Sequence, residues 1–496
     1  MNGVLTMSDL QKTIGPWSLV AIGAAGIVGS SYLYLSSSLF ESFTFGGVLL
    51  GMTVATLLAS CVAVGIAELA AMFPRAGGEF VYAYVGFGRF TSFIVGWLLI
   101  SIYSGIIGFY ITATGRLLSS VFPQLESVPL YDIGGGQMYL PILVIGLGLV
   151  GGTMVMNWFG TQMSFNVQLF LFIVLIAIGL VIATVAFSQG SYENTKPLFG
   201  DGSTRDGVLS GIAFIIPALG FLSGFSVVAA LAEEADVSRR KLGKLIVASV
   251  LIAGGFYTVI FYATGWIIPW QETTQLTNGT IEAFQVAGYP IVAILAFIAG
   301  FVGIITTVIA VFSSASRLMF ALSRAGMLPS FLGKVDKKTG VPRTAVLATG
   351  ALGLIYGLLG PDALQWILNV GGLYVAMVWI FTAVAFYTIR RKHPDKDRPY
   401  RVRFTVLPAV GGFAGVGLVL FTVIPSIPFG LQHPLEYALA VALLGIGLVL
   451  YIFAPRNLSR EQEQSLLLGD LDPNSSPESQ KEQPTNTSQV PVKESV

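Results

Sequence analysis

Long apolar stretches separated by short polar segments dominate this chain. Each stretch has about the 20 residues that a helix needs to cross the hydrocarbon core of a bilayer. Helices are expected because a helix in lipid satisfies its own backbone N–H and C=O groups. Twelve such stretches are predicted, at residues 16–39, 45–72, 90–118, 139–157, 163–187, 208–231, 243–268, 289–323, 343–360, 364–389, 404–425 and 435–454.

Two of these predicted spans are interrupted by glycine and serine, at residues 23–31 (GAAGIVGSS) and 217–226 (PALGFLSGFS). An interruption frees backbone groups that lipid cannot satisfy, so they must line a cavity or hold a ligand. A pair of interrupted spans at matching places in two halves of a chain points to a secondary transporter with a site near the bilayer midplane. The alternative is that the small residues only allow close helix packing. One such span favours packing, whereas the pair favours a site.

The two interruptions predict a site for an amino acid zwitterion. The start of a second half-helix presents N–H groups that attract a carboxylate. The end of a first half-helix presents carbonyls that attract an ammonium group or a metal cation. Phe225, beside the second interruption, is the aromatic residue best placed to close over a solute. The predicted substrate-binding residues are Gly26, Gly29, Ser30, Ser31, Phe221, Ser223, Gly224, Phe225 and Ser226.

Composition excludes several other classes of protein. The 496 residues are 54% hydrophobic and 11% charged, whereas soluble domains carry about 25% charged residues. A net charge of +1 argues against a nucleic-acid binder. One cysteine is too few for a disulfide within the chain or for a cysteine metal cluster. The two histidines, His393 and His433, lie in connecting segments, which argues against histidine catalysis in the membrane. We therefore expect neither an enzyme nor a cofactor, and the lack of a filter-like segment disfavours a channel.

The distribution of Lys and Arg predicts the topology. Eighteen of them fall in the loops on one side of the predicted spans and three in the loops on the other, and the positive side of a membrane protein is cytoplasmic. We expect a multi-pass protein of the cell membrane with both termini in the cytoplasm. Residues 1–15 form a cytoplasmic segment, residues 16–455 the transporter domain, and residues 456–496 a polar, disordered tail.

Several motifs in order along the chain resemble those of the amino acid–polyamine–organocation (APC) transporters. Residues 73–82 (FPRAGGEFVY) resemble the loop after span two of that family, residues 316–329 (SRLMFALSRAGMLP) its segment after span eight, and residues 390–400 its loop after span ten. The resemblance covers about residues 10–455. It implies an all-α fold of twelve membrane helices: a five-plus-five inverted repeat, with broken helices one and six at the substrate, and two additional helices at the end.

The chain departs from the family pattern in the second interruption. Many members have an acidic residue where this chain has Ser226, which disfavours a dibasic or polyamine substrate. The resemblance therefore implies a permease that moves a neutral amino acid by alternating access. The alternatives are a proton-coupled or exchanging transporter of another organic amine or solute, and a membrane nutrient sensor without net transport. The expected partners are a small-molecule solute and the lipid bilayer, with no nucleic acid, and the oligomeric state stays open.

Sodium is the coupling ion that we expect, making the protein a symporter. Thr306 and Thr307 supply adjacent hydroxyls in span eight, and carbonyls near Ala25 and Val28 supply further oxygen ligands, which suit a hard cation. Many proton-coupled or exchanging relatives carry a lysine in span five at the matching position, and span five here has none. The alternative is that the threonines bond back to their own helix.

Three acidic residues lie near the inner ends of predicted spans. Glu68 closes span two, and Glu233 and Glu234 close span six. Charges in such places are costly unless they are paired or reach water. They predict either an inner gate of ion pairs, with Arg75, Arg239 or Arg240 as partners, or simple solvated helix ends.

Overall fold

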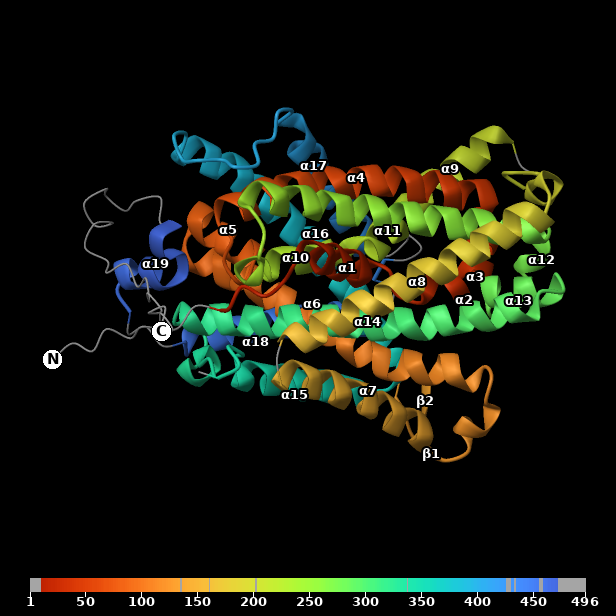
Figure 1. Cartoon of the computed structure of the whole chain (residues 1–496), viewed down its shortest axis with the longest axis horizontal. Helices are drawn as coiled ribbons and strands as arrows, with labels where there is room; N and C mark the ends of the chain where they lie inside the picture. Colours follow the sequence, from red (N-terminus) through yellow and green to blue (C-terminus); the bar gives the residue numbers. More distant parts are fainter. Residues whose placement is uncertain are drawn as a thin grey trace, which may run out of the picture.

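The computed structural model describes residues 10–133, 136–159, 161–200, 203–336, 338–424, 430–431, 434–454 and 458–471. Nearly all of its regular structure is α-helix, and the long helices run along the longest axis of the molecule (Figure 1). Ten helices in the described part are long and apolar enough to cross a membrane. They are α4 (Phe45–Met72), α6 (Arg89–Ser119), α7 (Leu140–Phe159), α8 (Thr161–Gln189), α9 (Thr204–Phe221, continued to Ala230), α11 (Arg239–Ile267), α14 (Pro290–Arg324), α16 (Pro361–Lys392), α17 (Val406–Val423) and α18 (Pro434–Ile452).

Two of the twelve predicted spans are shorter helices. In the first, α1 (Pro16–Ile27) has only 12 residues because the chain leaves the helix at the predicted interruption. In the ninth, α15 (Arg343–Gly357) has 15 residues. The prediction of a mainly helical polytopic protein is therefore confirmed, while the arrangement of twelve spans as two inverted repeats stays a prediction.

Short elements connect the long helices. A two-stranded antiparallel sheet of β1 (Pro129–Ile133) and β2 (Gly136–Tyr139), which the apolar pattern does not predict, precedes α7. The remaining short helices are α2 (Ser31–Tyr34), α3 (Ser36–Phe43), α5 (Glu79–Phe87), α10 (Ser226–Ala230), α12 (Trp270–Thr273), α13 (Gly279–Val286) and α19 (Arg460–Leu468), with 3₁₀ turns η1 (Pro123–Glu126), η2 (Tyr192–Thr195), η3 (Ser223–Phe225), η4 (Ala232–Glu234), η5 (Ser330–Gly333) and η6 (Gly469–Leu471).

Helix α1 lies in the middle of the bundle (Figure 1). It packs against α8, α11 and α14 and against the interrupted segment η3–α10. Ten of its residues, from Ser18 to Ile27, are buried, as expected for a helix that is apolar all round. The first interruption is therefore enclosed by protein, where a break in a membrane helix can be tolerated.

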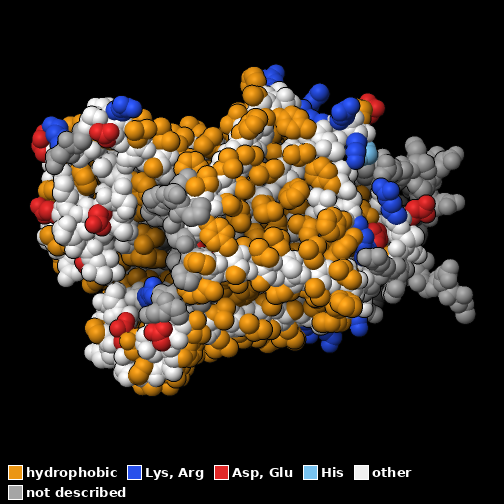
Figure 2. Space-filling model, turned by 180° about the vertical axis from the view of Figure 1, so that it is seen from behind, with side chains coloured by type: hydrophobic (Ala, Val, Ile, Leu, Met, Phe, Trp, Pro, Cys, Tyr) orange, Lys and Arg blue, Asp and Glu red, His pale blue; other side chains and the backbone are white. Residues whose placement is uncertain are grey.

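The outer surface has the pattern of a membrane protein. Figure 2 shows a broad band of hydrophobic side chains across the middle of the face that it draws, with charged side chains gathered toward the two ends. Large apolar residues are widely exposed on α8, α14, α17 and α18, among them Phe170, Ile291, Phe413 and Val441. An exposed apolar surface of this extent marks contact with a membrane or with protein, and its place between two charged ends favours lipid.

The first and last described segments meet at the same end of the bundle. The backbone N–H of Leu10 donates to Glu233 at the end of the second interrupted span. The carbonyl of Leu468, in α19, accepts hydrogen bonds from Arg75 at 3.0 and 3.3 Å. Helix α19 lies in residues 456–496, the segment that we expected to be a disordered tail. The expectation is wrong for this helix, because Leu467 and Leu468 are buried against the bundle. Composition alone does not reveal these two anchors.

Candidate functional site

The first interruption lies between α1 and α2. Helix α1 ends at Ile27, and Val28 adopts a non-helical conformation with φ −77° and ψ 88°. Gly29 and Ser30 are outside helices, and α2 begins at Ser31. The predicted interruption is therefore present. The end of α1 and the start of α2 flank the three non-helical residues Val28, Gly29 and Ser30.

The second interruption packs directly on the first. Helix α9 ends at Phe221, the single turn η3 follows, and α10 begins at Ser226. Gly224 lies so close to the carbonyl of Gly26 that a Cβ atom there would overlap it, and a Cβ on Gly26 would be 3.0 Å from the Gly224 carbonyl oxygen. The two breaks thus meet through bare backbone, which only glycine permits.

Hydroxyl groups from two other helices satisfy the carbonyls that α1 leaves free at its end. Tyr257, in α11, donates to the Ile27 carbonyl at 2.9 Å. Thr307, in α14, donates to the Ala25 carbonyl at 2.9 Å, with the Val28 carbonyl at 3.5 Å. The Ala25 and Val28 carbonyls therefore converge on one hydroxyl of span eight, that of Thr307.

The two adjacent threonines behave differently. Thr306 donates to the Gly303 carbonyl of its own helix at 3.0 Å, which is the alternative weighed for both residues. Three oxygens of the expected cation site, those of Ala25, Val28 and Thr307, are close together, and the Thr306 hydroxyl points elsewhere. The oxygen donors fit a hard monovalent cation, with one ligand fewer than predicted.

Sequence reasoning missed two residues beside this cluster. Gln168, on span five, donates from Nε2 to the Thr306 carbonyl at 3.0 Å, and its side-chain oxygen is buried without a hydrogen bond of normal geometry. Tyr110, on α6, places its hydroxyl where a side chain on Gly29 would be. Both are polar residues in mainly apolar spans, and that contrast could have identified them as candidate site residues from the sequence.

The other predicted substrate-binding residues have varied surroundings. The Ser30 hydroxyl is buried without a hydrogen bond of normal geometry to any described residue. Ser223 donates to the Gly220 carbonyl at 2.8 Å. Phe225 is fully buried, its ring 5.8 Å from that of Trp379, so it packs in the core of this structure. Phe221 is partly exposed and stacks on Tyr257. The side chain of Ser31 lies outside the described part of the structure.

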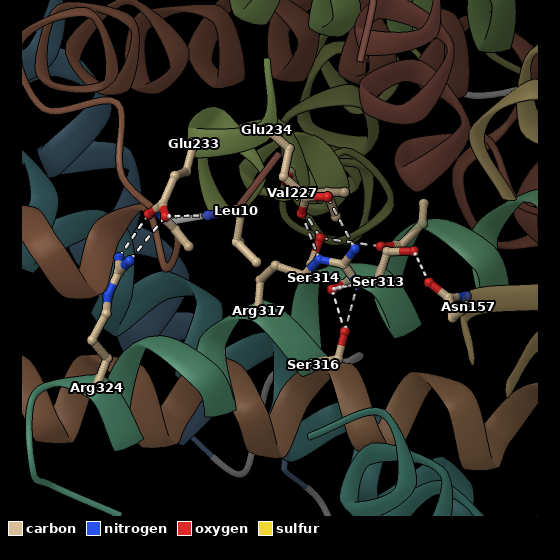
Figure 3. A network of polar contacts seen from close by, with 12 residues as sticks. Leu10, Asn157, Val227, Glu233, Glu234, Ser313, Ser314, Ser316, Arg317 and Arg324 are labelled. Atoms are coloured by element: carbon tan, nitrogen blue, oxygen red, sulfur yellow. Dashed lines mark hydrogen bonds and ion pairs between the residues drawn. The ribbon is translucent and has the colours of Figure 1, made fainter. Parts of the chain in front are cut away.

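A buried network of ion pairs lies at the end of the second interrupted span (Figure 3). Arg324 forms a two-bonded pair with Glu233 at 2.9 and 2.7 Å, and the backbone N–H groups of Ala76 and Leu10 donate to the same carboxylate. Burial disfavours the charged form of Glu233, but Arg324 and these donors outweigh it and lower its pKa to about 2. The carboxylate therefore stays ionised throughout the physiological range.

Glu234 has a second arginine partner. Arg317, which is fully buried, donates to Glu234 at 2.6 and 3.2 Å and to Ser316 at 2.9 Å (Figure 3). The backbone N–H groups of Thr13 and Ile14 donate to the Glu234 carbonyl, both at 3.0 Å. The segment before α1, the end of span six and α14 are thus bound together at this end of the bundle.

The acidic residues are buried ion-pair members, and the idea of solvated ends is wrong for them. Glu68 is fully buried and pairs with Arg390 at 2.8 and 2.5 Å, while the Val402 N–H donates to it. Of the expected partners, Arg75 acts on Glu233 through its charge. The side-chain hydrogen bonds come from Arg317, Arg324 and Arg390, which were not among the expected partners. These arginines are 83, 91 and 322 positions away from their partners in sequence, so local spacing could not identify them.

Comparisons with known proteins agree with this architecture. The profile of the family described as amino acid permease matches residues 14–450. The chain is 26% identical over 463 residues to the branched-chain amino acid permease BcaP of Bacillus subtilis, covering 91% of this chain and 95% of that protein. It is 24% identical to the methylthioribose transporter of the same organism, over 91% of this chain and 95% of that protein. Identity to the human cationic amino acid transporter 4 is 25%, over 79% of this chain and 62% of that protein.

Proposed function

The chain belongs to the amino acid permease family of the APC superfamily, and from that premise we propose that it moves a neutral amino acid across the cell membrane by alternating access. The observation that carries the proposal is the contact between the two interruptions at Gly26 and Gly224. It places the backbone polar groups of both broken spans together inside the protein, where a zwitterion can use them.

The preference for a neutral solute comes from Ser226 and from the pairing of the two acids at the end of span six. Glu233 and Glu234 are each held by an arginine, so neither is free to receive the second ammonium of a dibasic substrate. The printed names of the relatives differ in solute, from branched-chain and cationic amino acids to methylthioribose. The substrate of this chain therefore has to be argued from its own residues.

Sodium is the proposed coupling ion. The oxygens of Ala25, Val28 and Thr307 would hold it, in place of the hydrogen bond that Thr307 now donates. A bound cation there would tie span one to span eight and neutralise carbonyls at the end of α1, where the helix dipole is negative. Coupling follows because the same half-helix end would face the solute.

The buried ion pairs and the packed segment before α1 support an arrangement with this end of the bundle closed. If this end is cytoplasmic, as the positive charge of its loops indicates, solute would enter from outside and leave after Glu233 and Glu234 separate from α14. Rocking of spans 1, 2, 6 and 7 against spans 3, 4, 8 and 9 would do this.

A binding panel on the purified full-length protein tests the solute class. Neutral, cationic and acidic amino acids, putrescine and methylthioribose are each titrated with sodium or with choline, and thermal stabilisation is measured. A ligand that binds the native state raises its stability. We expect stabilisation by neutral amino acids, larger in sodium. Stabilisation by arginine or putrescine alone would contradict the neutral class.

A further inference from the structure

Glu79 is a buried carboxylate beside the second interruption. It is the first residue of α5, in the loop region that joins spans two and three and outside the candidate membrane spans. Only 1% of its surface is exposed, and neither carboxylate oxygen has a hydrogen bond of normal geometry. The Ser226 hydroxyl of the broken span is close enough to the Glu79 carboxylate to favour its ionised form.

The position of Glu79 is fixed by tight backbone contacts at the closed end of the bundle. The N–H of Gly77 donates to the Ala230 carbonyl at 3.1 Å. A Cβ on Gly78 would be 2.9 Å from the backbone of Ala229. Ala76, three residues earlier, donates to Glu233 of the ion-pair network. Glu79 therefore lies at the contact that has to open if solute leaves toward this end.

Glu79 differs from the other buried acids of this region. Glu68, Glu233 and Glu234 each pair with arginine. Within the described ranges, no Lys or Arg lies within ion-pair distance of Glu79. An isolated charge in such a place costs several kcal/mol, and a carboxyl group avoids that cost by binding a proton.

The groups that face Glu79 from each neighbouring element are uncharged. Tyr103 faces it from α6, Ser226 from α10, and Tyr82 from α5 itself. The basic residues at the end of α16 bind elsewhere, Arg390 to Glu68 and Lys392 to the Gly86 carbonyl. Burial raises the pKa of Glu79 from 4.5 to about 7, against the smaller opposing effects of Ser226 and of its own N–H.

We propose that Glu79 is a proton-binding site of the gate at this end, neutral while the gate is closed and ionised once water reaches it. The inference rests on the proposed function only in taking alternating access as the motion. It is separate from sodium binding, which would act between spans one and eight.

The direction of the pH effect follows from linkage. Closing the gate raises the pKa of Glu79, so closing takes up a proton. The closed state is therefore most favoured below pH 4.5, loses stability as the pH rises from there to about 7, and changes no further above it. Because one pKa unit corresponds to a tenfold change, the gate equilibrium should shift by roughly three hundredfold across this window.

Distances between two spin labels test the proposal without any solute. Cys61 is the single cysteine, so a Cys61→Ala background accepts labels at two exposed positions of this end, Arg240→Cys in the first turn of α11 and Phe331→Cys after α14. In the full-length protein in nanodiscs, the longer distance should gain population as the pH rises. Glu79→Gln, a neutral mimic of the protonated side chain, should hold the shorter distance at every pH.

Two further variants sharpen the test. Ser226→Ala removes a group that favours the ionised carboxylate, so it should move the midpoint of the distance change to higher pH. Glu461→Gln removes an exposed carboxylate at the same end and should leave the profile unchanged. A pH profile of Glu79→Gln equal to that of the parent, or no pH dependence in the parent, would overturn the proposal.

The same set of variants separates this proposal from the proposed function. If the gate distance responds to pH but the protein transports no amino acid, the proposed transport function is refuted and the proton site is supported. Amino acid flux with a gate insensitive to pH would refute the proton site alone. If Glu79→Gln weakens arginine or putrescine binding and leaves the pH profile intact, Glu79 is an ammonium receptor and the proposal is wrong.

Discussion

Gly26 in α1 and Gly224 in η3 touch through their backbones, and neither position has room for a side chain. These residues are 198 positions apart in the sequence, one in each interrupted span. Their contact brings together the free end of a first half-helix and the turn that precedes a second. The proposed solute site depends on this relationship more than on any one side chain.

Gly224→Ala should push η3 away from α1. Overpacking of this kind costs about 1–3 kcal/mol, and it falls directly on the proposed site, so solute affinity should drop by about tenfold or more. Equilibrium binding to the purified protein measures the change. Gly255→Ala is the matched control, because a Cβ at Gly255 in α11 meets nothing within 4 Å. Equal loss in both variants, or in neither, would contradict the role given to Gly224.

Gly29→Ala should impair solute binding through a collision with the Tyr110 hydroxyl. If the collision is the cause, Tyr110→Phe in the same protein should restore part of the affinity. Gly29→Leu should abolish binding with or without that change, because leucine also fills the space beside the break. The measurement is uptake and affinity in the four variants. Wild-type affinity in Gly29→Leu would remove the proposed site from span one.

Arg324→Ala should destabilise the end of the bundle at which Arg324 binds Glu233. It leaves the Glu233 carboxylate buried without its partner, which costs about 3–5 kcal/mol for a broken buried pair. The double variant Glu233→Gln, Arg324→Gln should recover part of that loss, since it leaves no lone charge. Thermal unfolding of the three proteins reports both effects, and a neutral outcome for Arg324→Ala would contradict the burial of the pair.

This ion pair should be insensitive to pH in the working range. The pKa of Glu233 is lowered to about 2, so its contribution is complete above the ordinary value of 4.5 and is lost only as the pH falls toward 2. Thermal stability of Glu233→Gln relative to the wild type should thus be constant from about pH 6 to 8. A difference that varies strongly within that interval would show that the pair is not ionised as described.

Thr307→Ala should abolish the effect of sodium on solute affinity, and Thr306→Ala should leave most of it. The Thr307 hydroxyl reaches carbonyls of span one, whereas that of Thr306 bonds to its own helix. Sodium and solute should raise each other's affinity by the same factor. Affinity is measured in sodium and in choline. Uptake that is unchanged when choline replaces sodium, yet is lost when the proton gradient is dissipated, would reject sodium in favour of proton coupling.

The apolar pattern was sufficient to predict the helical architecture and both interruptions. A helix in lipid must be long, apolar and unbroken, so each departure from that pattern is informative. Two features were not predictable in this way. The β1–β2 hairpin lies in a polar connection, and α19 is a polar helix anchored by two leucines, Leu467 and Leu468.

The chemistry of the site was only partly predictable. Gly26, Gly29 and Gly224 were identified because glycine in a membrane span signals a close approach. The sequence does not distinguish the roles of Thr306 and Thr307, because those roles depend on which face of span eight packs against span one. Glu79 lies in a loop motif of the sequence. Its burial could not be predicted because it depends on the packing of α10 against α5.

Counterflow of labelled neutral amino acids into proteoliposomes tests the central claim most directly. Vesicles that hold the full-length protein are loaded with unlabelled leucine, alanine or serine, and entry of the same labelled amino acid is followed, with Gly224→Ala vesicles as the matched control. The account predicts a transient accumulation with the wild type that is strongly reduced with Gly224→Ala and that arginine or putrescine competes for poorly. No counterflow of any neutral amino acid by a protein that binds one would contradict it and would favour a sensor without transport.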